Sequence, residues 1–462
     1  MRTNLPKARL RLSIRISDSG SSDAKGATQA MHPPEPIVPN PAIAAYVGID
    51  WADQKQDVIL CAQAEPTVVE HQVITHSPES LLDWVGNLQQ RFGTKGKILV
   101  CLEQSRGALI YHLMGYECFE LYPINPNQLA NYRASFKTSG AKDERPDAEL
   151  LCELVRCHRD RLIAWKPDTE LTRKLATLNE GRRQAVDRRS RLANEIKSTL
   201  KIYFPVALQV LENDTTTALA ADLLLRWPSL EALQKQSPSK LRKFFYGHNC
   251  RGEQKMLERL KLIKEALALT HDGAVIEPAA LRVQMLAEQL KSLLPYIARY
   301  EKQIPQLFDS HLDSFLFRDL PGAGSVLAPR LFCAFGSDRS RFQCAQQLSS
   351  LSGIAPVRRA SGKKSGKKGE KKASIHFRQA CPKFLRQSFH EFAACSIRYC
   401  SWAERFYEAH RARGKTHHVA VRALAFKWIR ILFVCWKERS PYQESRYLHA
   451  LQNRGSAHAQ SC

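Results

Sequence analysis

Four acidic residues lie where predicted strands or helices begin or end. Asp50 ends the apolar run "YVGID", and Glu103 ends the apolar run "KILVCLE". Asp143 and Asp147 are four residues apart at the start of a predicted helix, so both project from one helix face. Carboxylates gathered at one sheet edge repel one another unless cations lie between them. Hard oxygen ligands suit Mg²⁺ or Mn²⁺, and such ions can stabilise the attacking and leaving oxygens of a phosphodiester.

The spacing of these acids leaves a purely structural explanation open. Acidic residues are common at helix N-caps, as Asp143 would be, and in turns, as Asp50 would be. Glu103 could then follow its strand by chance.

A basic, Gly- and Ser-rich segment follows the motif "GIAPV" and could bind nucleic acid. Flexible cationic segments wrap phosphates and become ordered on binding, although most charge runs are solvated loops. Ser361 lies at the start of this segment, where cations would stabilise its alkoxide during attack on a phosphate. A linker role is the alternative, and Ser349, Ser350, Ser352 and Ser365 are competing serines. The cationic residues are Arg358, Arg359, Lys363, Lys364, Lys367, Lys368, Lys371 and Lys372.

A glycine turn, "LPGAG", joins two predicted helical segments. The backbone N–H groups of Gly322 and Gly324 could hold a phosphate where the turn enters a helix. An ordinary helix–helix turn explains the same residues equally well.

The composition indicates a multidomain protein with an anionic partner. The chain has 462 residues and a formal net charge of +24, and such an excess is typical of proteins that bind nucleic acid. Its 13 cysteines include no CxxC pair, which favours reduced thiols in the cytoplasm over a zinc or disulfide framework. We expect a cytoplasmic, nucleoid-associated protein without a membrane partner, because no apolar stretch is long enough to span a bilayer.

The pattern along the chain predicts five regions. Residues 1–41 and 441–462 are expected to be disordered, and Met31 is a candidate for the true start. Residues 42–165 alternate short strands and helices, as in a mixed α/β sheet. Residues 166–310 carry two heptad patterns, typical of a helical, coiled-coil linker. Either an intramolecular hairpin or a dimer would satisfy these heptads. Residues 311–440 are expected to form a mainly helical domain.

The motifs occur in an order that resembles a known family. "VGIDWA", "CLEQS", "SGAKDERPDAELL", "LPGAG", "LSGIAPVRRASGK" and "RARGK" are similar to those of the DEDD-type insertion-sequence transposases of the one-ten family. The resemblance covers roughly residues 42–438. It implies an RNase H-like (RuvC-like) N-terminal domain, a helical linker and a C-terminal transposase domain that bears a nucleophilic serine.

The resemblance also assigns roles to individual residues. It implies that Asp50, Glu103, Asp143 and Asp147 bind Mg²⁺ and that Ser361 attacks DNA and forms a phosphoserine. It further implies a guide RNA and a homodimer or tetramer, and linker arginines such as Arg182 and Arg189 could contact nucleic acid. Two other functions remain open: a junction-resolving nuclease that uses water, and a non-catalytic nucleic-acid-binding scaffold.

Overall fold

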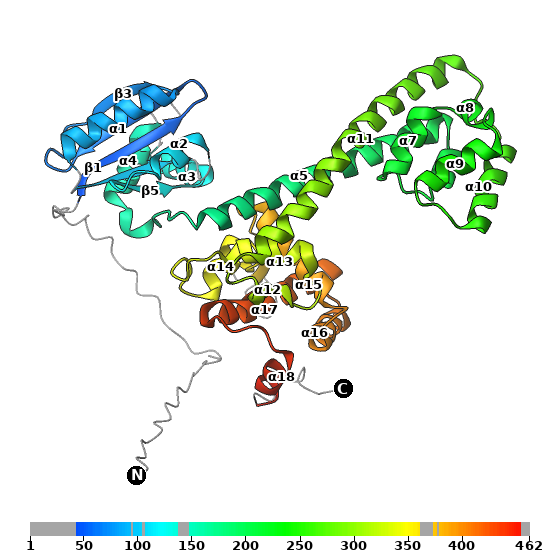
Figure 1. Cartoon of the computed structure of the whole chain (residues 1–462). Helices are drawn as coiled ribbons and strands as arrows, with labels where there is room; N and C mark the ends of the chain where they lie inside the picture. The colour runs from blue at the N-terminus through cyan, green and yellow to red at the C-terminus, as the bar shows by residue number, and fades with distance from the viewer. Residues whose placement is uncertain are drawn as a thin grey trace, which may run out of the picture. The chain divides into compact units, whose positions relative to one another are not determined.

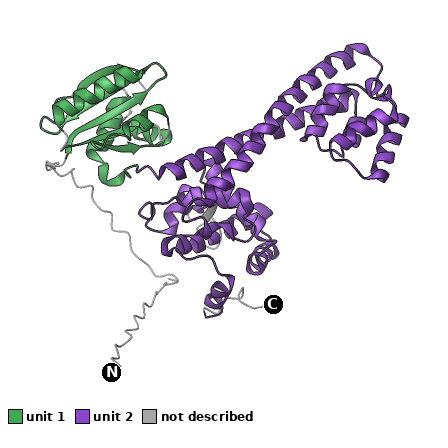
Figure 2. Ribbon diagram, in the orientation of Figure 1, with its two compact units in different colours: residues 1–165 green, residues 166–462 purple. Residues whose placement is uncertain are grey.

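The computed structural model describes residues 43–93, 96–103, 107–136, 147–360, 373–376 and 378–453. The predicted metal ligand Asp143, the predicted nucleophile Ser361 and the lysines of the basic segment lie outside these ranges, as does the N-terminal extension. The chain forms two compact units, Met1–Trp165 and Lys166–Cys462 (Figure 2). Each unit is described by itself.

The first unit contains a mixed five-stranded sheet, as the sequence predicts (Figure 1). The central strand β1 pairs antiparallel with β2 and parallel with β4. The outer strands continue these directions, β3 antiparallel to β2 and β5 parallel to β4, so the order is β3-β2-β1-β4-β5. The strands are β1 (Ile43–Trp51), β2 (Lys55–Ala62), β3 (Glu70–Thr75), β4 (Lys97–Leu102) and β5 (Phe119–Pro123).

Helices cover both faces of this sheet, and each face has its own apolar core. Val47 and Ile49 of β1 point to the core formed with α1 and α2. Because successive residues of a strand alternate between faces, Tyr46 points to the other core, formed with α4. The helices of this unit are α1 (Pro78–Phe92), α2 (Ala108–Leu113), α3 (Pro126–Phe136), α4 (Asp147–Cys157) and the short 3-10 helix η1 (Arg159–Arg161).

Two local features explain where the helices of this unit begin and pack. Ser77 caps α1 as the sequence predicts, because the Ser80 N–H donates to its hydroxyl at 3.2 Å. The helix α4 lies directly on β1 at Gly48, where a Cβ atom would overlap the backbone of Ala148 and Cys152. A glycine is therefore required there for the close approach of helix and strand.

The second unit is built on two long helices that pack against each other, α5 (Glu170–Tyr203) and α11 (Gly273–Asp309). Gly181 of α5 faces Tyr300 of α11, whose hydroxyl would lie 2.7 Å from a Cβ at the glycine. Arg182 and Glu301 form an ion pair of 2.6 Å across the same contact. The heptad residues are thus paired within one chain, which is the hairpin arrangement.

Each end of this helical hairpin joins a separate apolar core. One core combines the α5–α11 pair with the intervening helices, which are α6 (Val206–Val210), α7 (Ala218–Arg226), α8 (Leu230–Gln234), α9 (Pro238–Gly247) and α10 (Glu253–Glu265). The other contains the helices that follow α11, which are α12 (Phe315–Arg318), α13 (Gly324–Phe335), α14 (Ala345–Leu351), α15 (Lys383–Ser396), α16 (Ser401–Ala412), α17 (His417–Glu438) and α18 (Glu444–Gln452). A two-stranded hairpin, β6 (Val357–Ala360) and β7 (Ala373–His376), flanks the segment that includes Ser361.

Two predicted boundaries are wrong. Residue 310 does not separate compact units, because Leu175 of α5 and Ile304 and Phe308 of α11 are buried in the same core as the C-terminal helices. The segment 441–462 is not a disordered tail throughout, since it contains α18. Leu451 is buried and Tyr442 accepts a hydrogen bond from the Trp402 indole at 2.7 Å. Within the described ranges, no helix is both long and apolar enough to cross a membrane.

Candidate active site

Three of the four predicted acids lie at one edge of the sheet. β1 and β4 are parallel and Ile49 pairs with Leu102, so Asp50 and Glu103 are the next residues of neighbouring strands. The alternation along β1 places Asp50 on the face that α4 covers. Asp147 is the first residue of α4, which rests on β1 at Gly48, two residues before Asp50. Strand pairing and helix packing together therefore place these carboxylates at the same edge of the sheet.

The electrostatics of Asp50 reflect this convergence. Burial raises the pKa of Asp50, and the negative charges of Asp147, Glu103 and Asp57 raise it further, while Arg133 acts in the opposite direction. A carboxyl group that is desolvated among other carboxylates is costly for a fold and is typical of functional sites.

Two further residues of this cluster were missed by the sequence analysis. Asp57 of β2 is the direct cross-strand partner of Asp50 and contacts His71 at 3.3 Å. Its position follows from the hairpin register, which pairs Trp51 with Gln56 and was not worked out from the sequence. Arg133 lies on α3, a helix that was not predicted, and forms an ion pair with Asp147.

The donor chemistry of this edge fits a divalent cation that prefers oxygen. Asp50, Glu103 and Asp147 supply hard carboxylate ligands, and the charge repulsion at Asp50 would be relieved by a cation. Among the residues that the structure describes, no group of three acids, histidines or cysteines is close enough together to hold a metal ion. Asp143 lies outside these residues, so the set predicted from the sequence is described only in part.

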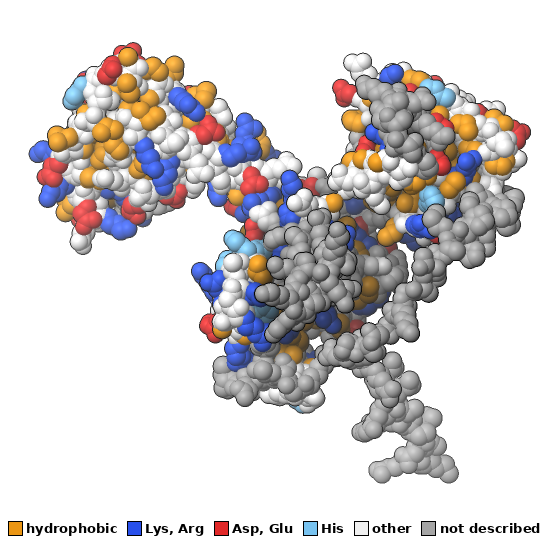
Figure 3. Space-filling model, turned by 180° about the vertical axis from the view of Figure 1, so that it is seen from behind, with side chains coloured by type: hydrophobic (Ala, Val, Ile, Leu, Met, Phe, Trp, Pro, Cys, Tyr) orange, Lys and Arg blue, Asp and Glu red, His pale blue; other side chains and the backbone are white. Residues whose placement is uncertain are grey.

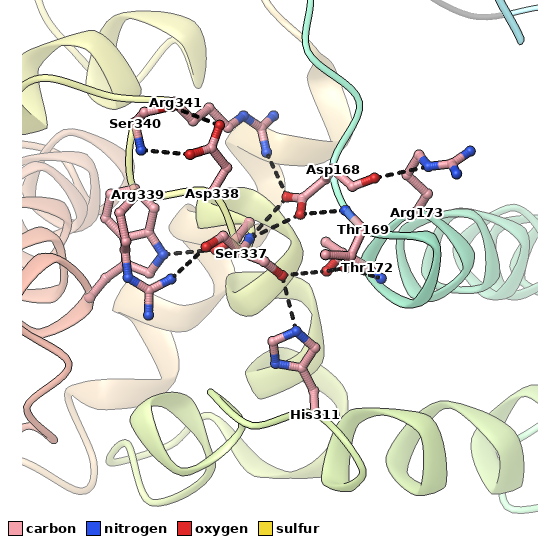
Figure 4. Close-up of polar contacts among 12 residues, drawn as sticks. Asp168, Thr169, Thr172, Arg173, His311, Ser337, Asp338, Arg339, Ser340 and Arg341 are labelled. Atoms are coloured by element: carbon pink, nitrogen blue, oxygen red, sulfur yellow. Dashed lines mark hydrogen bonds and ion pairs between the residues drawn. The ribbon is translucent and has the colours of Figure 1, made fainter. Parts of the chain in front are cut away.

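A second polar cluster contains a serine–histidine pair, but its geometry argues against a nucleophile (Figure 4). The hydroxyl of Ser337 lies 3.0 Å from Nε2 of His311 and 2.7 Å from the Thr172 hydroxyl. The backbone N–H of Asp313 donates to Nδ1 of His311 at 3.0 Å, so the neutral ring carries its hydrogen on Nε2. His311 therefore donates to Ser337 and cannot take its proton.

Two of the serines that compete with Ser361 are also unsuited to attack a substrate. Ser349 and Ser352 are fully buried, and their hydroxyls donate to the carbonyl oxygens of Ala345 and Ser349, at 2.9 and 3.2 Å. Neither hydroxyl can reach a phosphodiester without local unfolding.

The structure describes some of the residues that were predicted to bind nucleic acid. Arg182 forms an ion pair with Glu301, and its side chain is mostly buried. Arg189 is half-buried on α5. Arg358 and Arg359 belong to β6. Gly322 has a φ of +80° and packs against the backbone of Cys395 and Ser396, so its glycine is explained by the turn itself. Gly324 is exposed at the start of α13.

Basic side chains are not confined to these positions. On the face shown in Figure 3, Lys and Arg occur on both units, interspersed with acidic and apolar side chains.

Two regions of the chain match models of known protein families. A family model described as a transposase matches residues 47–205, and a model described as the transposase IS116/IS110/IS902 family matches residues 315–408. The first match contains Asp50, Glu103 and Asp147, and the second contains Ser361 and the helices α13–α15.

Individual relatives are insertion-element proteins from bacteria. A Streptomyces coelicolor protein described as the transposase for the mini-circle IS117 is 26% identical over 414 residues, which cover 88% of this chain and 97% of the relative. An insertion element IS110 protein of the same organism is 25% identical over 311 residues, covering 66% of this chain and 72% of the relative. An insertion element IS900 protein of Mycobacterium paratuberculosis is 24% identical over 324 residues, covering 69% and 77%.

Proposed function

Because the chain carries, in order, both transposase domains of the IS110/IS116 insertion-sequence family, we propose that it excises and inserts DNA through a covalent serine–DNA intermediate. The observation that carries the proposal is the convergence of Asp50, Glu103 and Asp147 at one sheet edge. A purely structural role does not explain why a half-buried carboxylate is kept beside other carboxylates.

Each group has a separate role in the proposed reaction. Asp50, Glu103, Asp143 and Asp147 would hold Mg²⁺ or Mn²⁺, which, when bound, stabilises negative charge on the phosphodiester oxygens. The hydroxyl of Ser361 attacks the DNA phosphorus, a bond from serine oxygen to phosphorus forms, and the bond from phosphorus to the sugar oxygen breaks. The proton lost by the serine is balanced by the one gained at the released sugar hydroxyl. Cations flanking Ser361 favour its alkoxide.

The partners follow from the same proposal. Base pairing with a guide RNA encoded by the element would select the DNA sequence, while the protein, with its charge of +24, contacts the nucleic-acid backbone. A homodimer or tetramer would hold both ends of the element. Sequencing of RNA that co-purifies with the protein tests this part, and RNA unrelated to the DNA around the gene would contradict it.

One experiment separates the proposed reaction from hydrolysis by water. We expect Ser361→Ala to abolish both recombination and the covalent protein–DNA adduct seen after denaturing electrophoresis. Ser365→Ala, a change of the same kind in the same segment, should leave both intact. A nuclease would still cut DNA as Ser361→Ala, and a scaffold would show no Mg²⁺-dependent strand cleavage in any variant.

A further inference from the structure

We propose that α15 and α17 form a binding site for the phosphate groups of a nucleic acid, made by Arg386 and His390 of α15 and His417, His418 and Arg422 of α17. The identity of the ligand as a nucleic acid rests on the proposed function. Its chemical class, a phosphate anion, rests on the side chains themselves.

The five side chains belong to two helices that pack side by side. The ring centroids of His390 and His418 are 5.6 Å apart, and those of His417 and His418 are 5.2 Å apart. Arg386 precedes His390 by four residues and therefore lies on the same face of α15. The Tyr407 hydroxyl of α16 lies 2.9 Å from Nδ1 of His417 and helps to fix that ring.

The charged groups that shift the pKa values of His390 and Arg422 are basic. The charges of His418, His417 and Arg422 lower the pKa of His390. The charge of Arg386 lowers the pKa of Arg422. The neighbouring acid, Glu391, is directed to α13 instead, where it accepts from Arg330 at 2.6 Å. Like charges packed together oppose one another unless an anion is bound between them. These neighbouring basic groups therefore favour the binding of an anion between them.

The helix α17 adds to the attraction for an anion. It begins at His417, and its N-cap residue Thr416 makes no side-chain hydrogen bond to the first turn. Helix N-termini present free N–H groups and a partial positive charge to ligands. His417 and His418 are exposed, so a phosphate can reach them from solvent.

The site is connected to the segment that includes the proposed nucleophile. Arg386 donates to the carbonyl oxygen of Arg378 at 3.4 Å, and Arg378 follows β7 by two residues. β7 pairs with β6, and these strands flank the segment with Ser361. A nucleic-acid phosphate held by Arg386 would therefore lie at the base of this hairpin.

Protonation should be coupled to binding at this site. Burial lowers the pKa of His390, and His418, His417 and Arg422 lower it further, while a backbone hydrogen bond with His418 acts in the opposite direction. His390 is thus mostly neutral in the free protein at neutral pH. A bound phosphate favours the protonated ring, so the affinity for nucleic acid should rise as the pH falls from about 8 to about 6.

Binding of labelled probes to the full-length protein tests the proposal without any strand cleavage. A random-sequence DNA duplex and a single-stranded RNA are titrated in EDTA, at several salt concentrations and pH values. We expect His418→Gln and Arg386→Gln to weaken binding about tenfold. The slope of log affinity against log salt should fall by about 1 for Arg386→Gln. His390→Gln should reduce the pH dependence.

Exposed residues elsewhere in the same unit provide matched controls. Arg430→Gln on α17 and His271→Gln before α11 should retain wild-type affinity and pH dependence. A loss with one probe only would assign the site to DNA or to RNA. Wild-type affinity and pH dependence for both probes in the His390→Gln/His418→Gln double variant would overturn the proposal. Because no chemistry is measured, that outcome is distinct from the absence of a Ser361–DNA adduct.

Discussion

Asp50 lies beside other carboxylates, and its ionised form is therefore costly for the fold. Burial and the charges of Asp147, Glu103 and Asp57 raise its pKa above the ordinary value of 3.8. A carboxyl group with a raised pKa stabilises the folded state below its unfolded pKa, and this contribution is lost as the pH rises through the folded pKa. At neutral pH, Asp50→Asn should therefore raise the unfolding temperature by a few degrees while abolishing DNA cleavage.

Thermal unfolding with and without Mg²⁺ measures both parts of this prediction. Mg²⁺ should raise the unfolding temperature of the wild type and have little effect on Asp50→Asn, because a ligand stabilises only the state that binds it. Asp53→Asn, an exposed change in the following turn, should behave as the wild type. An unchanged or lower unfolding temperature for Asp50→Asn in EDTA would contradict the idea that repulsion among the acids is relieved by a cation.

At the scale of elements, the position of α4 on β1 decides whether Asp147 approaches Asp50. A Cβ at Gly48 would overlap the backbone oxygen of Ala148 and nitrogen of Cys152, and backbone atoms cannot rotate away as a side chain can. Gly48→Ala should therefore destabilise the first unit by about 1–3 kcal/mol, as other overpacking changes do. It should also reduce the Mg²⁺-dependent rise in unfolding temperature, because α4 carries Asp147.

Gly86→Ala on α1 is the matched control for Gly48→Ala. No atom lies within 4 Å of a Cβ at Gly86, which is an exposed position inside a helix. Alanine should stabilise the helix there by about 0.5–1 kcal/mol. Chemical denaturation of both variants checks the difference, and equal effects of the two alanines would show that the contact between α4 and β1 is not tight.

The elements also show what sequence reasoning could reach. The five strands, the Ser77 cap and the long helices followed from period, caps and turn residues. The helix α3 and the ordered α18 were missed, because α3 has a weak apolar stripe and α18 is held by contacts with Trp402, distant in sequence. Asp57 was missed because its place near Asp50 depends on the strand register. Arg133 was missed because it lies on α3, which was not predicted.

At the scale of the whole chain, the second unit depends on a polar cluster that ties its first helix to the C-terminal core (Figure 4). The backbone N–H of Ser337, after α13, donates to the Asp168 carboxylate at 2.9 Å, just before α5. His311, after α11, completes the connection through the Ser337 hydroxyl. The Trp436 indole of α17 donates to the Gly336 carbonyl oxygen at 2.7 Å. Segments distant in sequence are thus joined at one point, which no local pattern could indicate.

This cluster predicts that the second unit loses stability in mild acid. Burial lowers the pKa of His311 below the ordinary value of 6.5, although Asp313 and Asp168 oppose the shift. Below pH 6.5 the unfolded chain therefore binds a proton that the folded chain does not, and stability falls as the pH decreases toward the folded pKa. His311→Gln, which keeps a donor for Ser337 but does not titrate, should be about 1 kcal/mol less stable at pH near 7.5, and its stability should depend less on pH.

Urea denaturation between about pH 5 and 8 measures this, with the exposed His449→Gln as a control that follows the wild type. Parallel pH profiles for His311→Gln and the wild type would show that a protonated His311 is tolerated in the fold, and the tautomer that rules out Ser337 as a nucleophile would then need revision.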